Sequence, residues 1–272
     1  MEQNLSKKTR TESDLIGSRE VPESALYGVQ TLRGIENFRI SKFHLNEYPL
    51  FIQALAITKM GAAVANRELD LLTEEQADAI LKACKEILEG KHHDQFPVDM
   101  IQGGAGTTTN MNANEVIANR ALELMGHQRG EYQYCSPNDH VNRSQSTNDA
   151  YPTAIHIGLY YTHLKLVKHF EVLIESFRKK ATEFAHVIKM GRTQLEDAVP
   201  MTLGQTFNGF ASILRHEVKN LDFAAQDFLT VNMGATAIGT GITAEPEYAE
   251  KCIAALRKIT GLDINLADDL GG

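Results

Sequence analysis

An all-α fold is predicted by three features of the sequence. Apolar residues recur at three- and four-residue steps over long stretches after Tyr48, whereas the alternation of apolar and polar residues that marks a strand is scarce. Glycines fall mostly in loops or where the apolar stretches end. The stretch TEEQADAILKACKEILEG also carries helix boundary signals, because Thr73 and Gln76 have capping-box spacing and Gly90 suits a left-handed exit.

Further helices are predicted along the chain. One is expected from about Asn112 to Met125, with Gly126 as its stop. A long helix is expected over 151–188, with Pro152 in its first turn, and it would measure about 55 Å. The apolar pattern resumes over 203–228 and predicts a second helix of similar length, so the two would form an antiparallel pair in a bundle.

Two domains are predicted from this change in character. The first is expected over residues 1–149, and residues 150–272 are expected to form part of a central helical bundle. The apolar stripes of the bundle helices are broader than a single partner helix requires. We therefore expect the bundle to continue into other subunits.

Composition narrows the class of protein. The chain has 272 residues, of which 43% are hydrophobic and 23% charged, and this suits a folded protein with a substantial core. No apolar stretch approaches the roughly 20 residues of a membrane span, and the polar opening residues lack the apolar run of a signal peptide. The sequence therefore predicts a cytoplasmic protein that does not bind membranes.

Charge and cysteine content exclude further classes. The net charge of −8, without a dominant cluster of lysine and arginine, argues against nucleic-acid binding. The three cysteines are far apart and odd in number, which favours reduced thiols over disulfides and offers no metal-ligand spacing. We expect neither a metal nor another cofactor.

Three segments are dense in small polar residues: QGGAGTTTNMNANEV, SPNDHVNRSQSTNDAYPT and GRTQLEDAVPMTLGQTF. Helix caps and turns explain part of each segment. In the third, Glu196, Asp197 and Pro200 fit the start of a helix, but Gly-Arg-Thr-Gln before them is not needed for that role. Neutral donors of this kind bind carboxylates and stabilise developing negative charge, as carbanion or enolate chemistry requires.

Signals of several common enzymes are missing from the sequence. We find no G-x-S-x-G elbow, no P-loop, no H-E-x-x-H and no G-x-G-x-x-G after a strand. The motifs GGAGTTTNMNANEV, NRSQSTNDAYPT and GRTQLEDAVPMTLGQ instead resemble the fumarase/aspartase superfamily of lyases, from about Gly17 to Asp269. Within it, LELMGHQRGEYQY and the third motif are most similar to the branch that reversibly removes ammonia from L-aspartate to give fumarate.

The resemblance implies a set of substrate-binding residues. By position these are Thr107, Ser146, Thr147, Asn148, Thr193 and Gln194. It further implies a homotetramer whose sites, shared between subunits, take a small dicarboxylate or amino acid. Arg33 matches an arginine of the family's amino-terminal segment, which implies a role in binding or positioning.

Roles for these residues follow from the family's chemistry. A base removes a proton beside the side-chain carboxylate, and Thr107, Ser146 and Thr147 would donate to the resulting aci-carboxylate. Thr193 would hold the other carboxylate, and Asn148 the amino group.

Gln194 bears on the leaving group. Fumarases generally carry histidine at this position, and a carboxamide cannot supply the proton that a departing hydroxide needs. Ammonia leaves as a neutral molecule, so Gln194 favours deamination.

The resemblance also predicts a part that the sequence does not contain. The family's flexible serine loop, which supplies the general base, is expected beyond Gly272, together with the rest of the bundle and a small further domain. No general base is therefore assigned within these residues. Two alternatives to deamination stay open: a fumarate hydratase, and a non-catalytic fragment that assembles only through its bundle helices.

Overall fold

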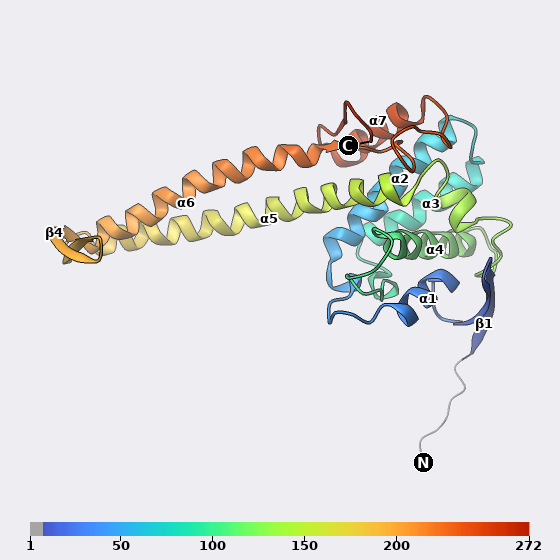
Figure 1. Ribbon diagram of the computed structural model, residues 1–272, viewed down its shortest axis with the longest axis horizontal. Coiled ribbons are helices and arrows are strands. Elements are labelled where there is room, and N and C mark those ends of the chain that lie inside the picture. Colours follow the sequence, from blue (N-terminus) through green and yellow to red (C-terminus); the bar gives the residue numbers. More distant parts are fainter. Residues whose placement is uncertain (1–7, 272) are drawn as a thin grey trace, which may run out of the picture. The chain divides into compact units, whose positions relative to one another are not determined.

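The computed structural model describes residues 8–271, and the chain is predominantly helical, as predicted. The α-helices are α1 (Val29–Asn37), α2 (Pro49–Glu68), α3 (Glu74–Leu88), α4 (Thr107–Leu124), α5 (Thr147–Glu183), α6 (Leu203–Ala225) and α7 (Tyr248–Thr260) (Figure 1). Short 3-10 segments are η1 (Leu45–Glu47), η2 (His93–Gln95) and η4 (Gln226–Leu229), and η3 (Pro137–Val141) is a π-helical turn.

Strands form three two-stranded sheets within the described residues. The antiparallel pairs are β1 (Thr9–Asp14) with β2 (Gly17–Pro22) and β3 (Ile188–Thr193) with β4 (Glu196–Thr202), and the parallel pair is β5 (Thr230–Val231) with β6 (Asn265–Leu266).

The chain divides into two compact units. Unit 1 contains the chain up to Gly158 and again from Leu229, and unit 2 contains Leu159–Phe228. The predicted domain boundary, between residues 149 and 150, stays a prediction. Helix α5 begins in unit 1 and ends in unit 2.

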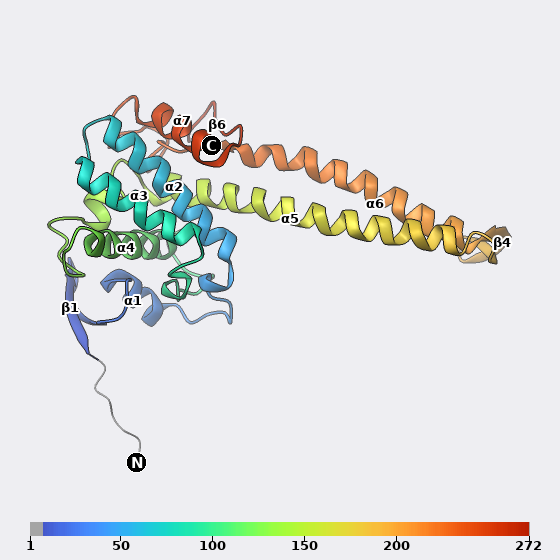
Figure 2. The same cartoon turned by 180° about the vertical axis from the view of Figure 1, so that it is seen from behind.

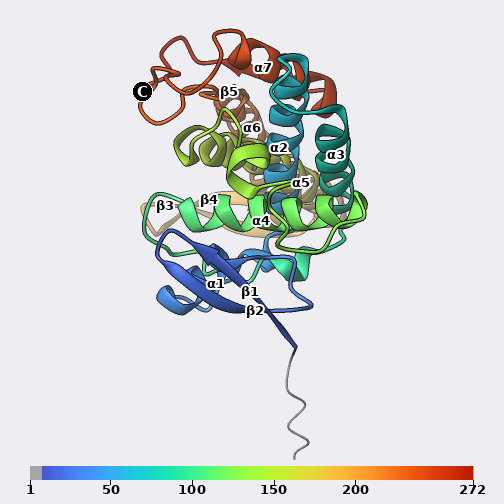
Figure 3. The ribbon, with the colours of Figure 1, turned by 90° about the vertical axis from the view of Figure 1, so that its right-hand side faces the viewer.

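Helix α2 forms the centre of unit 1. It packs against α3 and α7, and α3 in turn packs against α4 (Figure 3). The residues of α2 are apolar or small on nearly every face, which is typical of a helix surrounded by protein. The predicted capping box of α3 is confirmed, because the Gln76 N–H donates to Thr73 and Gly90 has a φ of 87°.

The start of α1 is held by a side chain from another helix. The buried carboxylate of Glu115 in α4 accepts hydrogen bonds from the backbone N–H groups of Gly28, Gln30 and Thr31, at 2.8, 2.8 and 3.0 Å. These groups at the start of a helix have no partner within the helix itself. Glu115 therefore does the work that a local capping residue usually does.

The predicted start of α4 at Asn112 is wrong, since the helix begins at Thr107. Gln102 explains the difference, because its Oε1 accepts from the Thr109 N–H and its Nε2 donates to Thr109 Oγ1, both at 2.8 Å. This cap from outside the helix offsets the low helix propensity of the three threonines. The predicted end is confirmed at Met125 and Gly126, which has a φ of 83°.

Unit 2 is an antiparallel pair formed by α6 and the part of α5 after Gly158 (Figures 1 and 2). Aromatic rings join the pair, with Phe177 near both Phe207 and Phe210 at centroid distances of 6.0 and 5.6 Å. His163 Nε2 also lies 2.9 Å from Asp222 Oδ1. The expectation of similar lengths is wrong, because α5 has 37 residues and α6 has 23.

The loop between these helices also differs from the prediction. Glu196, Asp197 and Pro200 do not start a helix but lie in β4, where Pro200 pairs with Met190. The helix begins at Leu203, after a capping box formed by Thr202 and Gln205. Acidic residues and proline favour a first helical turn, but here they lie in an exposed hairpin, and the later Thr-x-x-Gln signal is the one that the chain uses.

Candidate functional site

The first predicted segment lies at the start of α4. Thr107 is exposed in the first turn, and its hydroxyl donates to the Gly104 carbonyl at 2.6 Å. Gly106 before it has a φ of 90°, and a side chain there would collide with the ring of Tyr151. Glycine at this position thus permits close contact between the first and second polar segments.

The second segment runs through η3 and ends in the first turns of α5. Ser146 Oγ accepts from the Asn148 N–H at 3.2 Å, and Thr147 Oγ1 accepts from Asn110 Nδ2 at 3.4 Å. Since Asn110 belongs to α4, this bond is a further link between the two segments. The structure therefore brings Thr107 and the Ser146–Asn148 turn onto adjoining elements of unit 1.

A further stretch of unit 1, Val231–Gly241, lies against the Ser146–Asn148 turn. Asn148 Nδ2 donates to the Ala237 carbonyl at 2.7 Å, which leaves the Asn148 Oδ1 as an acceptor. Pro152 has no N–H, so the Asn148 carbonyl lacks its usual helical partner and accepts instead from Asn232 Nδ2 at 3.2 Å. None of the site residues predicted from the sequence lies in this segment.

Lys59 is a buried cation beneath the second segment. Its Nζ donates to Asn110 Oδ1, Asn142 Oδ1 and Gln145 Oε1 at 2.8, 3.0 and 2.8 Å. Burial lowers the pKa of Lys59 to about 7, and the negative charge of Asp149 opposes that shift. The three amide oxygens satisfy all three donors of the ammonium, which makes a lysine at 1% exposure tolerable.

Sequence reasoning missed both Lys59 and Asp149. A signal for Lys59 was present, because it stands alone among the apolar residues of ALAITKMGAAVA. Asp149 stands directly after the predicted Ser146–Asn148 group but was given no role, and its side chain is fully buried. Their partners lie far away in the chain, so neither role was visible locally.

Thr193 and Gln194 lie in unit 2, at the turn between β3 and β4. Both side chains are exposed, and Gln194 and Leu195 have φ values of 50° and 71°. Two consecutive residues other than glycine in the left-handed region cost about 1–2 kcal/mol each. Such local strain is common at functional sites.

Arg33 is already engaged by protein groups. Its Nε and Nη2 donate to the two carboxylate oxygens of Asp14 at 2.8 and 2.9 Å, and Nη2 also donates to the Gly17 carbonyl. This bidentate ion pair fixes α1 on the β1–β2 turn. It gives Arg33 a structural role, and its predicted part in binding stays a prediction.

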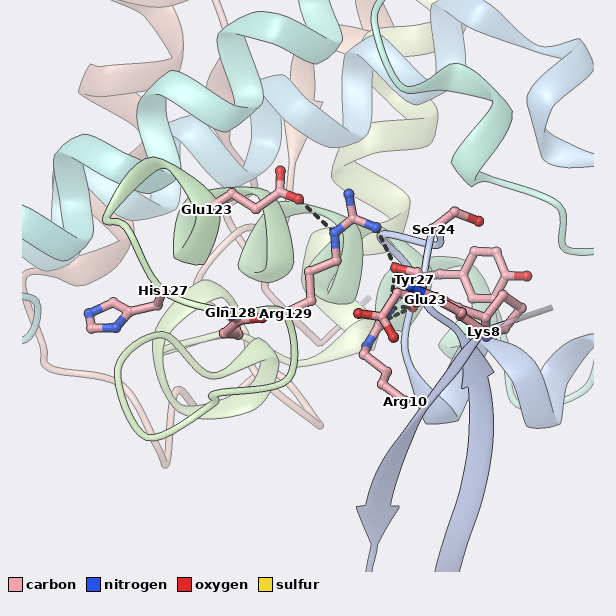
Figure 4. A pocket seen from close by; sticks show the side chains of 10 residues that line it. Lys8, Arg10, Glu23, Ser24, Tyr27, Glu123, His127, Gln128 and Arg129 are labelled. Atoms are coloured by element: carbon pink, nitrogen blue, oxygen red, sulfur yellow. Dashed lines mark hydrogen bonds and ion pairs between the residues drawn. The ribbon is translucent and has the colours of Figure 1, made fainter. Parts of the chain in front are cut away.

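A cavity with a volume of about 990 Å³ lies elsewhere in unit 1, between β1 and the end of α4 (Figure 4). Its charged groups pair with protein groups: Arg129 Nε lies 2.6 Å from Glu123, and Arg10 Nη2 lies 2.7 Å from Glu12. None of the predicted site residues lines it. We therefore do not take this cavity as the site.

Residues 8–271 show neither a metal-binding cluster nor a membrane-spanning helix. No group of three or more histidine, cysteine, aspartate or glutamate residues could hold a metal ion there. No helix within the same range is long and apolar enough to cross a membrane.

Comparisons with known proteins agree with the motifs. The model of a lyase family matches residues 17–270. Aspartate ammonia-lyase of Escherichia coli (strain K12) is 54% identical over 267 residues, which cover 98% of this chain and 56% of that protein. The enzyme of the same name from Helicobacter pylori (strain J99) is 52% identical over 261 residues, covering 96% and 56%.

Solved structures give the same result. A fumarate lyase:delta crystallin from Brucella melitensis superposes with a TM-score of 0.92 at 50% identity, covering 97% of this chain and 57% of that one. A class II fumarase from Schistosoma mansoni has a TM-score of 0.87 at 33% identity, covering 97% and 58%. The chain thus spans somewhat over half the length of the relatives it matches, and with a family model matched over nearly all of its residues, it belongs to this lyase family.

Proposed function

We propose that the protein removes ammonia reversibly from L-aspartate to give fumarate. The observation that carries this proposal is the identity of 52–55% to aspartate ammonia-lyases across nearly the whole chain. In this proposal, the base takes a proton from the carbon beside the side-chain carboxylate, and the aci-carboxylate so formed then expels ammonia. The residues of unit 1 hold the charge that develops.

The hydroxyls of Ser146 and Thr147 suit the aci-carboxylate. In the bonds described for residues 8–271 both hydroxyl oxygens accept, from the Asn148 N–H and from Asn110, so their protons can still be donated. The Thr107 hydroxyl donates to Gly104 and would have to rotate before it could join them. Rotation of a hydroxyl is a small motion, and the site would then have three donors for one oxyanion.

Asn148 suits the amino group. One N–H of its Nδ2 binds the Ala237 carbonyl and so orients the amide, and Oδ1 is the acceptor that the amide then offers to a ligand. An ammonium group has only donors, so this orientation matches it. The same oxygen would release ammonia easily, because neutral ammonia is a weaker donor than ammonium.

Gln194 supports ammonia over water as the leaving group. A carboxamide has no titratable proton to give to hydroxide, whereas the departure of neutral ammonia requires none. We propose that Thr193 anchors the second carboxylate from the same turn. The strain at Gln194 and Leu195 favours a functional role for this turn over a purely structural one.

Thr193 and Gln194 would complete the site from another subunit of a homotetramer. Unit 2 supports this proposal through large apolar side chains on both of its helices, with Val172 67%, Ile213 61% and Phe223 82% exposed. Apolar surface of this kind marks an interface. Sedimentation of a monomer at micromolar concentration would contradict the assembly.

The test of the reaction compares two substrates on the protein as its own gene encodes it. We expect fumarate to form from L-aspartate, followed by its ultraviolet absorbance, and not from L-malate. Turnover of L-malate alone would make the protein a fumarase, as the Schistosoma mansoni match allows. Turnover of neither substrate would leave assembly through the bundle helices as its function.

A further inference from the structure

The carboxylate of Asp149 connects two segments that are far apart in the chain. Its Oδ1 accepts from the Ser146 N–H at 2.9 Å, and its Oδ2 accepts from the N–H groups of Gly234 and Thr236 at 3.2 and 2.9 Å. The side chain is 0% exposed. One buried carboxylate thus holds the turn that carries Ser146–Asn148 against the Val231–Gly241 segment.

The segment on the far side is strained where the carboxylate binds it. Thr236 has a φ of 58° although it is β-branched, and its hydroxyl is buried without a partner among the described residues. Gly234 has a φ of 96° and lies so close to α7 that a side chain would come within 2.6 Å of the Ala249 methyl group. A β-branched residue in this conformation persists only where its surroundings hold it there.

Two further bonds cross the same junction, and both involve Asn148. Its Nδ2 donates to Ala237 and its carbonyl accepts from Asn232, on either side of the two groups that Asp149 binds. The Asn148 side chain is therefore oriented by the segment that Asp149 fixes. If the Val231–Gly241 segment moved, the Asn148 side chain would no longer be held in one orientation.

The charges of Asp149 and Lys59 partly compensate each other at this junction. Burial raises the pKa of Asp149, while its three N–H donors and the positive charge of Lys59 limit the rise. Lys59 itself binds Asn110, which donates to Thr147. The Ser146–Asn148 turn is thus held from one side by a buried cation network and from the other by a buried anion.

We propose that Asp149 is a positioning residue, which sets the direction of the Ser146, Thr147 and Asn148 side chains by fixing the strained Val231–Gly241 segment to their turn. The expected effect on KM rests on the proposed function, whereas the expected effect on the local structure does not. Asp149 itself contacts no substrate in this role. Its loss would impair substrate binding more than it impairs the fold.

The test substitutes Asp149→Asn, with Glu115→Gln as the matched control. Each change removes one of two oxygens from a buried carboxylate that accepts three backbone N–H groups, but Glu115 serves the start of α1. On the protein as its gene encodes it, we expect Asp149→Asn to raise KM for L-aspartate tenfold or more. Glu115→Gln should lose comparable thermal stability with KM changed less than twofold.

Hydrogen exchange separates this inference from the proposed function. Asp149→Asn should accelerate amide exchange in peptides covering 144–149 and 231–238 together, while Glu115→Gln accelerates neither. Equal KM changes in both variants, or faster exchange in only one of the two peptides, would overturn the positioning role. If the unmodified protein does not act on L-aspartate, the reaction is wrong, and the exchange result alone decides the role of Asp149.

A milder variant covers the case in which Asp149→Asn fails to fold. Asn232→Ala removes the bond to the Asn148 carbonyl at a partly exposed position. We expect it to raise KM about threefold, the effect of roughly 0.7 kcal/mol. If KM and the amide exchange of residues 144–149 both stayed unchanged, the Val231–Gly241 segment would not be what orients the Ser146–Asn148 turn.

Discussion

The two units of the chain stabilise themselves in opposite ways. In unit 1 the polar groups go inside, where Lys59, Glu115 and Asp149 are all buried and each binds at least three partners. In unit 2 the apolar groups stay outside, and side chains such as Phe223 and Ile213 are mostly exposed. Unit 1 thus surrounds its buried charged groups with partners of its own, whereas unit 2 leaves large apolar side chains uncovered.

This contrast teaches where function and assembly are encoded. A buried polar network specifies one arrangement of its members, because any other arrangement leaves a donor or acceptor unpaired. An exposed apolar stripe instead specifies association and is satisfied only by another surface. Unit 1 fixes the geometry of the Ser146–Asn148 turn, and unit 2 carries the apolar side chains through which we propose that subunits associate.

The largest effect on this difference between the units is expected when the buried lysine of unit 1, Lys59, is replaced. Lys59→Met leaves three buried amide oxygens without their donor, and we expect the free energy of unfolding to fall by about 3–5 kcal/mol. Urea unfolding followed by circular dichroism measures it. The control Lys165→Met, on the exposed part of α5, should stay within about 0.5 kcal/mol, and equal losses in the two variants would refute the difference between the units.

A charge on the apolar stripe of unit 2 should act on assembly rather than on folding. Phe223→Glu is expected to weaken subunit association by about 2–4 kcal/mol, because a large exposed aromatic side chain is a typical interface anchor. Analytical ultracentrifugation across a concentration series would show smaller species. Asn208→Glu, which adds the same charge at an exposed polar position of α6, serves as the control; dissociation by both would point to charge alone.

An ion pair at the edge of unit 1 predicts how stability depends on pH. Arg120 binds Glu86 at 2.6 and 2.8 Å and lowers the pKa of that carboxyl to about 2, below its ordinary 4.5. A lowered folded-state pKa adds stability above pH 4.5, which is lost as the pH falls from 4.5 towards 2.

Glu86→Gln should therefore cost about 2 kcal/mol at pH 7 and progressively less in acid. Thermal unfolding at several pH values measures this difference. If the gap between the two proteins stayed constant from pH 7 to pH 3, the ion pair with Arg120 would not be its source.

The smallest effect is expected at the turn of unit 2. Replacing Gln194 and Leu195 with Asn and Gly suits a two-residue hairpin with positive φ, and should stabilise the protein by about 1 kcal/mol. Differential scanning calorimetry would detect the gain. Activity on L-aspartate should nevertheless fall, and a variant that is both more stable and fully active would remove the argument for a functional turn.

The fold was largely predictable where its signals are local. Thr73 and Gln76 form the capping box that their spacing indicates, and α5 follows the apolar period over most of its length. The start of α4 was missed because Gln102 caps it from outside the helix. The β3–β4 hairpin was missed because acids and a proline serve two kinds of structure.

The candidate site was predictable only through the small polar residues of its motifs. Thr107 and Ser146–Asn148 stand out as an excess of small polar residues, but Lys59 lies 51 and 86 residues from Asn110 and Gln145. No pattern within one segment indicates which distant amides will surround a lysine. The support of the site is thus a tertiary property, although its residues are named by the motifs.

Pro152 has a consequence for the order in which the protein folds. By leaving the Asn148 carbonyl open, it makes the first turn of α5 depend on Asn232, which lies 84 residues later in the chain. A contact at this separation requires a long loop to close first. The rest of α5, by contrast, is held by hydrogen bonds between residues close in sequence. The Leu159–Phe228 hairpin shortens that search by folding the intervening chain back on itself. The turn that bears Ser146–Asn148 therefore reaches its final geometry only once the chain around Asn232 has come into place.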